Sequence, residues 1–123
     1  MEFDSHLPIY MQIMHVIKNR IVSGQLRGGD KLPSVRDLAK EFKVNPNTIQ
    51  RCYQELEREN LVFTQRGLGT FVTEDLEAIK TLKTKMAHEL TQNFIEQMKK
   101  LGFAPQEIIK IISDRINRRH DDE

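Results

Sequence analysis

The sequence predicts a mainly α fold with one small β-hairpin, because three patterns follow one another between residues 32 and 73. A short helix with a capping pattern comes first, and a second helix with a polar outer face follows it. Two runs of β-forming residues then flank a turn with two glycines. One earlier helix and two later ones complete the expectation of an N-terminal domain over residues 1–73 and a two-helix tail over residues 74–123.

The earlier helix is expected from about Pro8 to Ser23, where apolar residues recur at helical spacing. Gly24 is expected to end it, because glycine readily adopts the left-handed conformation that closes many helices. A glycine-containing loop over residues 28–30 then leads to the next helix. The apolar face of the earlier helix consists of Ile9, Tyr10, Ile13, Ile17 and Ile21.

Two capping patterns mark the starts of the next two helices. Ser34 stands three residues before Asp37, the spacing at which a hydroxyl caps a helix and an acidic side chain reaches back. Asn45 is a favourable N-cap, and Pro46 suits the first helical position because an amide there has no partner to lose. The buried faces are expected to hold Val35, Leu38, Ala39 and Phe42 in one helix and Ile49, Cys52, Tyr53 and Leu56 in the other.

The outward face of the helix after Asn45 is rich in amide and guanidinium groups. At about 100° per residue, the side chains opposite the buried face are Asn47, Arg51, Gln54 and Arg58, with Thr48, Gln50 and Glu55 on the flanks. Arginine can pair with guanine, and asparagine or glutamine with adenine, in a major groove wide enough to admit a helix. The plainer interpretation is that these side chains keep a surface helix soluble. The preceding capped helix and the following hairpin favour DNA recognition.

The hairpin is expected to pair residues 61–65 with residues 70–73 across the turn Arg66-Gly67-Leu68-Gly69. Gly67 and Gly69 permit positive φ and allow the backbone to approach another molecule closely. Arg66 stands at the tip, where a guanidinium suits the negative potential of an adjacent minor groove. Turn geometry alone is a second explanation for the two glycines.

A long apolar repeat begins near Glu74 and predicts one helix of about 27 residues, which Gly102 ends. Pro105 is expected to start a second helix, although the isoleucine-rich run after it also suits a strand. Two apolar stripes on so short a segment lack a cover of their own, so a second copy of the chain is the expected partner. The expected dimer interface consists of Leu82, Met86, Leu90, Phe94, Met98, Ile108 and Ile112.

Composition restricts the class of protein without pointing to nucleic acid. The net charge is +1, and 38% hydrophobic with 30% charged residues is typical of a soluble globular protein. Cys52 is the single cysteine, so an intramolecular disulfide is excluded, and its place on a buried face favours packing over redox chemistry. The sequence has no apolar run of 18 residues, and its acidic start, Met1 to Asp4, is unlike a signal peptide. A cytoplasmic protein without a membrane partner is expected.

Catalytic and metal sites find little support in the sequence. The four histidines are scattered, and none lies at metal-ligand spacing from a cysteine or a carboxylate. The glycine turn lacks the lysine and the following helix of a phosphate-binding loop, and no nucleophile stands beside a suitable base. We therefore expect neither an enzyme nor a cofactor or metal ion.

Seven short motifs are spread over the first part of the chain: Pro8-Ile9-Tyr10-x-Gln12-Ile13, Gly24-Gln25-Leu26, Leu32-Pro33-Ser34-x-Arg36-x-Leu38-Ala39, Val44-Asn45-x-Asn47-Thr48-Ile49, Tyr53-x-x-Leu56, Asn60-Leu61-Val62 and Arg66-Gly67-x-Gly69-Thr70-Phe71-Val72. In these motifs the chain resembles the winged-helix domain of the GntR family of bacterial transcription regulators. The tail, with Leu101-Gly102-Phe103-x-Pro105-x-Glu107-Ile108, resembles the YtrA subgroup. Members of that subgroup lack large ligand-binding domains and are often linked to transport genes.

The resemblance implies DNA contacts at particular positions of this chain. Arg36 would grip phosphate or a base, and Arg66 and Gly67 match the contacts of the wing. Some members carry an arginine where this chain has Pro46, so Arg51 or Asn47 becomes the expected base reader here. The full expected set is Arg36, Asn45, Asn47, Thr48, Gln50, Arg51, Gln54, Arg66 and Gly67.

These observations predict a homodimeric winged helix-turn-helix regulator that represses transcription by occupying an inverted-repeat operator. One alternative is a ligand-gated regulator with a small pocket between the tail helices near Phe94, Met98 and Phe103. Another is a protein-interaction module, but the amide-rich face argues against it because protein interfaces favour apolar or aromatic anchors. The sequence leaves open the operator bases, the regulated genes and the identity of any small-molecule effector. It also leaves open whether binding represses or activates transcription.

Overall fold

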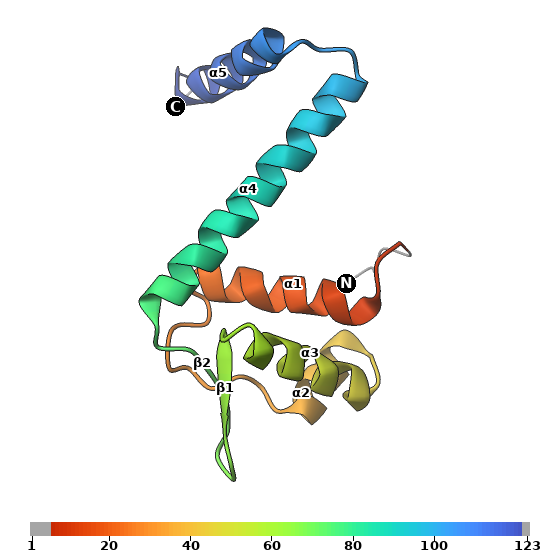
Figure 1. Cartoon of the computed structure of the whole chain (residues 1–123), viewed down its shortest axis with the longest axis vertical. Coiled ribbons are helices and arrows are strands. Elements are labelled where there is room, and N and C mark those ends of the chain that lie inside the picture. Colours follow the sequence, from red (N-terminus) through yellow and green to blue (C-terminus); the bar gives the residue numbers. More distant parts are fainter. Residues whose placement is uncertain (1–5, 122–123) are drawn as a thin grey trace. The chain divides into compact units, whose positions relative to one another are not determined.

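A computed structural model describes residues 6–121 of the chain, with side chains described as far as residue 118. The chain divides into two compact units, Met1–Lys83 and Thr84–Glu123. The acidic start from Met1 to Asp4, which is unlike a signal peptide, lies outside the described residues. The elements in order are α1 (Ile9–Val22), α2 (Val35–Phe42), α3 (Pro46–Arg58), β1 (Val62–Gln65), β2 (Gly69–Val72), α4 (Leu76–Lys100) and α5 (Pro105–Asp121) (Figure 1). This order confirms the predicted mainly α fold with one hairpin.

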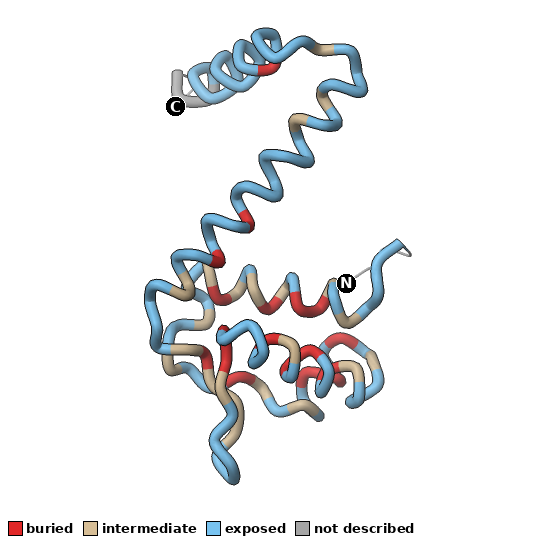
Figure 2. The backbone as a smooth tube through the Cα atoms, in the orientation of Figure 1, coloured by how far each residue is buried: buried red, intermediate tan, exposed pale blue. Residues whose placement is uncertain are grey.

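The core of the first unit lies where α1, α2, α3 and the base of the hairpin face one another (Figure 2). Ile13, Ile49 and Leu56 have no exposed surface, and burying each such side chain contributes about 1.5–3 kcal/mol. The predicted face of α1 needs one correction, because Ile9 is 45% exposed and Met14 is buried instead. The buried face of α1 begins one turn into the helix, so the first residue projects beyond the core.

The two predicted N-caps are present. The Ser34 hydroxyl oxygen accepts a hydrogen bond from the Asp37 amide at 3.0 Å, and the Asn45 side-chain oxygen accepts one from the Asn47 amide at 2.8 Å. Between the two helices, Lys43 adopts a left-handed conformation with φ of 57°. A lysine there costs about 1–2 kcal/mol, which the packing of α2 against α3 offsets.

The hairpin is antiparallel, with Val62 opposite Val72 and the rings of Phe63 and Phe71 stacked at 5.6 Å. Its turn extends away from the three helices (Figure 1). A segment that the sequence presented as loop lies along the other edge of β2, where Lys31 bridges Phe71 and the Leu32 amide donates to the Thr70 carbonyl oxygen at 2.8 Å. β2 is thus paired along both edges, with β1 on one side and with this segment on the other.

The helix α4 begins at Leu76, two residues later than the periodicity predicts, because the Asp75 carboxylate caps it. One Asp75 oxygen accepts from the amides of Glu77 and Ala78 at 3.0 and 3.3 Å. Gly102, with φ of 94°, follows the end of α4 as predicted. Between residues 6 and 121, no helix combines the length and the apolar character that crossing a membrane requires.

The isoleucine-rich run after Pro105 is a helix, which excludes the strand alternative. Ala104 has no capping side chain, and Glu107 compensates, because its carboxylate accepts a hydrogen bond from the Ala104 amide at 2.9 Å. Ile108 is buried, whereas most of the described residues of α5 are exposed (Figure 2).

Candidate nucleic-acid interface

The helix α3 turns a polar face to solvent because its opposite face fills the core. Ile49, Cys52 and Leu56 are fully buried on the inner side. Of the predicted contact residues on α3 and at its N-cap, Thr48 alone is half-buried. The exposed ones are Asn45, Asn47, Gln50, Arg51 and Gln54. The first turns of α3 therefore offer several hydrogen-bonding side chains in one place.

Asn45 serves the fold before it can serve a ligand. Its side-chain oxygen is the N-cap acceptor of α3, so this oxygen is occupied by the Asn47 amide. The side-chain nitrogen is the group that remains for a contact with an outside molecule. Among the predicted contact residues, Asn45 thus has a structural role that the outward-pointing Asn47 side chain does not share.

The start of α2 is fixed to α3 by a buried tyrosine. The Tyr53 hydroxyl donates a hydrogen bond to the Pro33 carbonyl oxygen at 2.6 Å, one residue before the Ser34 cap. Burial raises the pKa of Tyr53, so the hydroxyl keeps its proton and remains a donor at neutral pH. Arg36 is exposed in the first turn of α2, the helix whose start this hydrogen bond fixes to α3.

The wing carries Arg66 and Gly67 at its exposed turn. Gly67 has φ of 81° and Gly69 has φ of 126°, so both glycines occupy conformations that other residues adopt with strain. At Gly69 an added Cβ would lie 2.7 Å from Cε of Lys31, because the lysine side chain crosses over the wing there. A hollow of about 380 Å³ lies between the wing turn and residues 31–35.

Lys31 is a candidate contact that sequence reasoning missed. It is exposed, it lies against the wing, and its ammonium group can bind phosphate. In the sequence Lys31 is a single lysine at the end of a loop, with no periodicity or capping role to distinguish it. Its pairing with β2 is the feature that places it at the interface.

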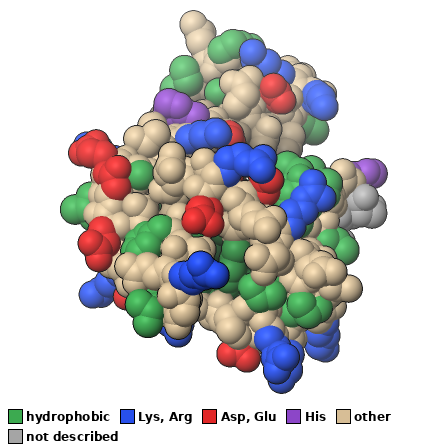
Figure 3. Space-filling view, turned by 60° about the horizontal axis from the view of Figure 1, so that its bottom comes forward, with side chains coloured by type: hydrophobic (Ala, Val, Ile, Leu, Met, Phe, Trp, Pro, Cys, Tyr) green, Lys and Arg blue, Asp and Glu red, His purple; other side chains and the backbone are tan. Residues whose placement is uncertain are grey.

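Several basic residues of the first unit that do not belong to the predicted contact set are paired with carboxylates. Lys18 pairs with Glu59 at 2.9 Å, and Arg58 pairs with Glu55 at 3.3 Å. Within the described residues, no carboxylate lies within ion-pair distance of Lys31, Arg36, Arg51 or Arg66. Figure 3 shows the Lys and Arg side chains as separate groups interspersed with acidic ones, not as one continuous patch. The low net charge is therefore compatible with a few well-placed cations.

The residues of the predicted dimer interface differ in exposure. Leu82 is buried in the first unit, Met86 and Ile108 are buried in the second, and Met98 is half-buried. Leu90 is 68% exposed, and Phe94 and Ile112 are exposed as well. The chain therefore covers part of the predicted stripe itself and leaves the rest open.

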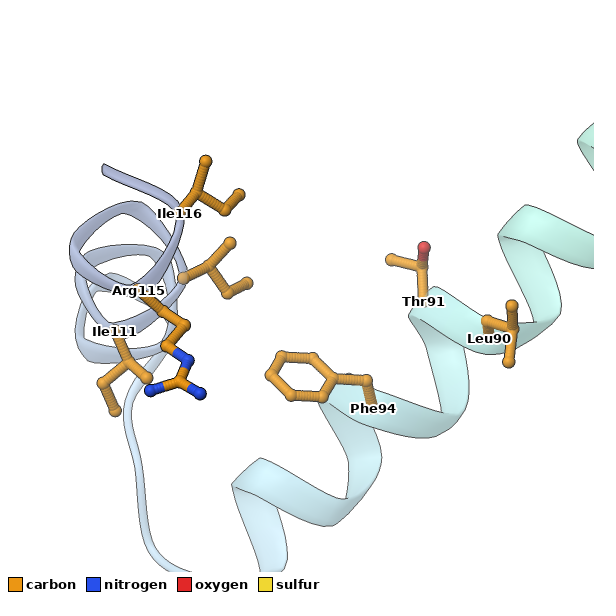
Figure 4. A pocket seen from close by; sticks show the side chains of 7 residues that line it. Leu90, Thr91, Phe94, Ile111, Arg115 and Ile116 are labelled. Carbon is orange, nitrogen blue, oxygen red and sulfur yellow. The ribbon is translucent and has the colours of Figure 1, made fainter. Parts of the chain in front are cut away.

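Five exposed apolar residues of the second unit line one hollow of about 480 Å³ between α4 and α5, namely Leu90, Phe94, Ile111, Ile112 and Ile116. Phe94 points from α4 towards α5, where Arg115 supplies the charged group of the lining (Figure 4). Met98 and Phe103, which the sequence suggested for such a pocket, lie outside this lining. In the range that the structure describes, no three His, Cys, Asp or Glu side chains are grouped to hold a metal ion.

A family model for bacterial regulatory proteins of the gntR family matches residues 9–72. The chain is 49% identical over 109 residues to the uncharacterised HTH-type transcriptional regulator YhcF of Bacillus subtilis, covering 89% of this chain and 90% of YhcF. It is 41% identical over 97 residues to the HTH-type transcriptional repressor YtrA of Bacillus subtilis, covering 79% of this chain and 70% of YtrA.

Solved structures show the same fold. A GntR family transcriptional regulator from Listeria monocytogenes has a TM-score of 0.83 and 47% identity, covering 91% of this chain and 98% of that one. The DNA-binding domain of AraR in complex with operator ORR3 has a TM-score of 0.54 and 32% identity, covering 59% of this chain and 86% of that one. The first of these likenesses extends through the tail helices, and the second covers a little over half of the chain.

Proposed function

This chain belongs to the GntR family of bacterial regulatory proteins and is similar to YtrA-type members, and we propose that it is a homodimeric repressor that binds an inverted-repeat operator. The observation that carries the proposal is the exposed amide and guanidinium face of α3, fixed on a core that buries the opposite face. A helix with such a face fits the major groove, and its polar side chains can form paired hydrogen bonds to base edges. The repressor YtrA among the relatives supports repression as the outcome.

The exposed residues divide into three roles in this proposal. Asn47 and Arg51 read base edges, because their side chains project from the first two turns of α3. Arg36 holds a phosphate beside them, since α2 starts next to α3. Arg66 reaches the adjacent minor groove from the wing turn, where Gly67 lets the backbone approach.

An operator selected from a library of random duplexes provides the direct test of the proposed function. Fluorescence anisotropy should show tight binding to the selected duplex and much weaker binding to random duplexes of equal length. If the dimer makes roughly 6–10 phosphate contacts, raising salt from 50 to 200 mM should weaken binding by about 10³–10⁵-fold. Salt-insensitive binding, or equal affinity for all duplexes, would contradict the proposal.

Substitutions separate base reading from phosphate binding. Arg51→Ala or Asn47→Ala should cost about 1–3 kcal/mol on the selected operator and relax selectivity, because each removes hydrogen bonds to a base. Arg36→Ala should weaken binding to selected and random duplexes alike. Lys18→Ala is the matched control, since this basic residue lies on α1 and pairs with Glu59. Uniform losses for all three variants would show that the face is assigned wrongly.

The second copy of the chain is proposed to pack on the exposed apolar residues of the second unit. Leu90, Phe94 and Ile112 are exposed on facing sides of α4 and α5, and water contact with such a surface is unfavourable. A symmetric pair covers both copies of the surface at once and brings two α3 helices to one operator. The structural match in Listeria monocytogenes covers 91% of this chain, which supports the tail as a shared feature of this fold.

Leu90→Asp tests the interface because it places a charge in a surface that dimerisation removes from water. Light scattering should report monomers, and binding to a half-site should persist. His88→Asp is the matched control, because residue 88 lies about 200° around the helix from residue 90 and is exposed. A Leu90→Asp protein that remains dimeric would place the interface elsewhere.

A ligand-gated regulator is a second candidate function, favoured by the hollow between α4 and α5. Its lining is apolar except for Thr91 and Arg115, a composition that suits a small apolar anion such as a short fatty acid. Titrating short fatty acids into the protein–operator complex tests this candidate, and a change in operator affinity that Arg115→Gln abolishes would support it. Unchanged affinity across the series would count against it.

Transport genes as targets remain a prediction from the resemblance to YtrA-type regulators.

Transcription in vitro from promoters that contain the selected operator measures the direction of regulation. A repressor lowers the transcript level as protein is added, because the bound dimer excludes polymerase from the promoter. A rise in transcript would instead assign activation.

A further inference from the structure

Arg51, on the exposed polar face of α3, is held by a residue from a different helix. The guanidinium carbon of Arg51 lies 3.8 Å from the centre of the Tyr10 ring, which is half-buried on α1. This is the contact distance of two flat groups that face each other, and arginine commonly stacks on aromatic rings in this way. Arg51 itself is exposed, so its free edge remains accessible to a partner molecule.

The neighbouring residue on α3 holds Tyr10 by its backbone. The Cys52 thiol donates a hydrogen bond to the Tyr10 carbonyl oxygen at 3.2 Å, and burial raises the pKa of this thiol to about 11, so the donor proton is retained. Two successive residues of α3 therefore contact the ring and the carbonyl group of one residue on α1. The position of the ring relative to α3 is fixed at two points.

The stacked pair lies within the predicted DNA-contact surface. Tyr10 and Arg51 share a hollow of about 360 Å³ with Ile9, Asn47 and Thr48, two of which are predicted contact residues. The N–H donors of a guanidinium lie in its plane, so stacking on one face leaves them free for hydrogen bonds. In the described part of the chain, no carboxylate competes for them.

We propose that Tyr10 is a positioning residue for base reading, which holds the Arg51 guanidinium in the orientation that recognises guanine. This inference rests on the proposed DNA-binding function. A free arginine loses side-chain entropy when it docks on a base edge, whereas a stacked one has already lost part of it. The aromatic ring of α1 thus contributes to sequence selectivity without touching a base itself.

The rival interpretation of the same contact is that stacking holds the Arg51 guanidinium away from DNA. The two interpretations predict opposite signs, because loss of a positioning ring weakens operator binding and loss of a withholding ring strengthens it. The Tyr10 to Arg51 contact can therefore be assigned by the direction of one affinity change.

A double-mutant cycle on the full-length protein tests the proposal, with anisotropy on the selected operator and on random duplexes. Tyr10→Leu removes the aromatic face and should weaken operator binding about 3-fold or more while leaving random duplexes nearly unchanged. Tyr10→Phe keeps the face and should restore affinity and selectivity. In the Arg51→Ala background, Tyr10→Leu should have no further effect, since the ring then has no guanidinium to hold.

Three results for the Tyr10→Leu substitution would overturn the inference. These are a gain in operator affinity for Tyr10→Leu, equal losses on operator and random duplexes, or a loss that persists in the Arg51→Ala background. Failure of Tyr10→Phe to restore selectivity would also overturn it, because the ring face would then not be the active feature. If the unmodified protein selects no operator, the proposed function fails together with this inference, whereas a selective protein with additive substitutions overturns this inference alone.

Discussion

The two units of the chain use the same apolar repeat in different ways. In the first unit the stripes of α1, α2 and α3 cover one another, so that Ile13 and Ile49 have no exposed surface. In the second unit Leu90 is 68% exposed and Ile116 is 63% exposed, and among its described residues only Met86 and Ile108 are buried (Figure 2). A repeat of three or four residues therefore identifies a helix with an apolar face, but not what covers that face.

Removing residues 84–123 should have the largest effect, because it separates the closed first unit from the exposed apolar surface of the second. The remaining unit keeps its own core, including Leu82, so we expect a folded monomer. Affinity for a full inverted repeat should fall by about 10²–10⁴-fold, because the second half-site loses the benefit of linkage. Circular dichroism measures folding, light scattering measures the oligomeric state, and anisotropy measures the affinity for the operator. A truncated chain that is dimeric and binds at full strength would place the interface in the first unit.

Single truncations of side chains in each unit should differ in their effect on folding. Ile49→Ala should lower the free energy of unfolding by about 2–5 kcal/mol, because it leaves a cavity in a closed core. Ile116→Ala should change the stability of the monomer by less than about 0.5 kcal/mol, because this side chain is largely in water. Each substitution is made in the monomeric Leu90→Asp protein. Urea unfolding of the resulting proteins then gives the two changes in the free energy of unfolding. Similar losses at both positions would show that the two units are closed to the same degree.

Gly67→Val tests whether the wing of the first unit contacts DNA. The positive φ makes valine strained there by about 1–2 kcal/mol, while no atom lies within 4 Å of the added Cβ, so the fold should persist. Operator affinity should fall by about 1–3 kcal/mol, because a branched side chain at the turn blocks close approach.

Gly24→Val is the matched control for the wing, since Gly24 also has positive φ and open space around its Cβ position. Both variants should melt at similar temperatures, and only the wing variant should lose operator affinity. Equal binding by the two variants would remove Gly67 from the interface.

The free energy of unfolding should depend modestly on pH, because the closed core of the first unit buries a thiol. Burial raises the pKa of Cys52 from 9.0 to about 11, so the folded state holds the proton more tightly than the unfolded state. The contribution is complete below pH 9 and is lost as pH rises towards 11, which lowers the free energy of unfolding by about 1 kcal/mol between pH 8 and 10. Urea unfolding at both pH values measures it. Cys52→Ala should remove this part of the slope, and an unchanged slope would show that the thiol is not responsible.

Features that depend on neighbours along the chain could be predicted from the residue types alone. The caps at Ser34 and Asn45 and the glycine after α4 lie where the residue types predict them, because each acts within one helical turn. The inner and outer faces of α3 follow from the helical repeat in the same way. The polar residues of the candidate interface could therefore be named before their positions in space were known.

Features that depend on contacts between distant segments became visible only in the folded chain. Lys31 reached the wing through pairing with β2, and Tyr10 met Arg51 because α1 packs on α3, more than 40 residues apart in the chain. The burial of Leu82 beside the exposure of Leu90 likewise reflects which surfaces other elements occupy. Nothing in the residue types distinguishes these positions from their neighbours, since the free energy of such contacts arises only when the packed elements bring the two partners together.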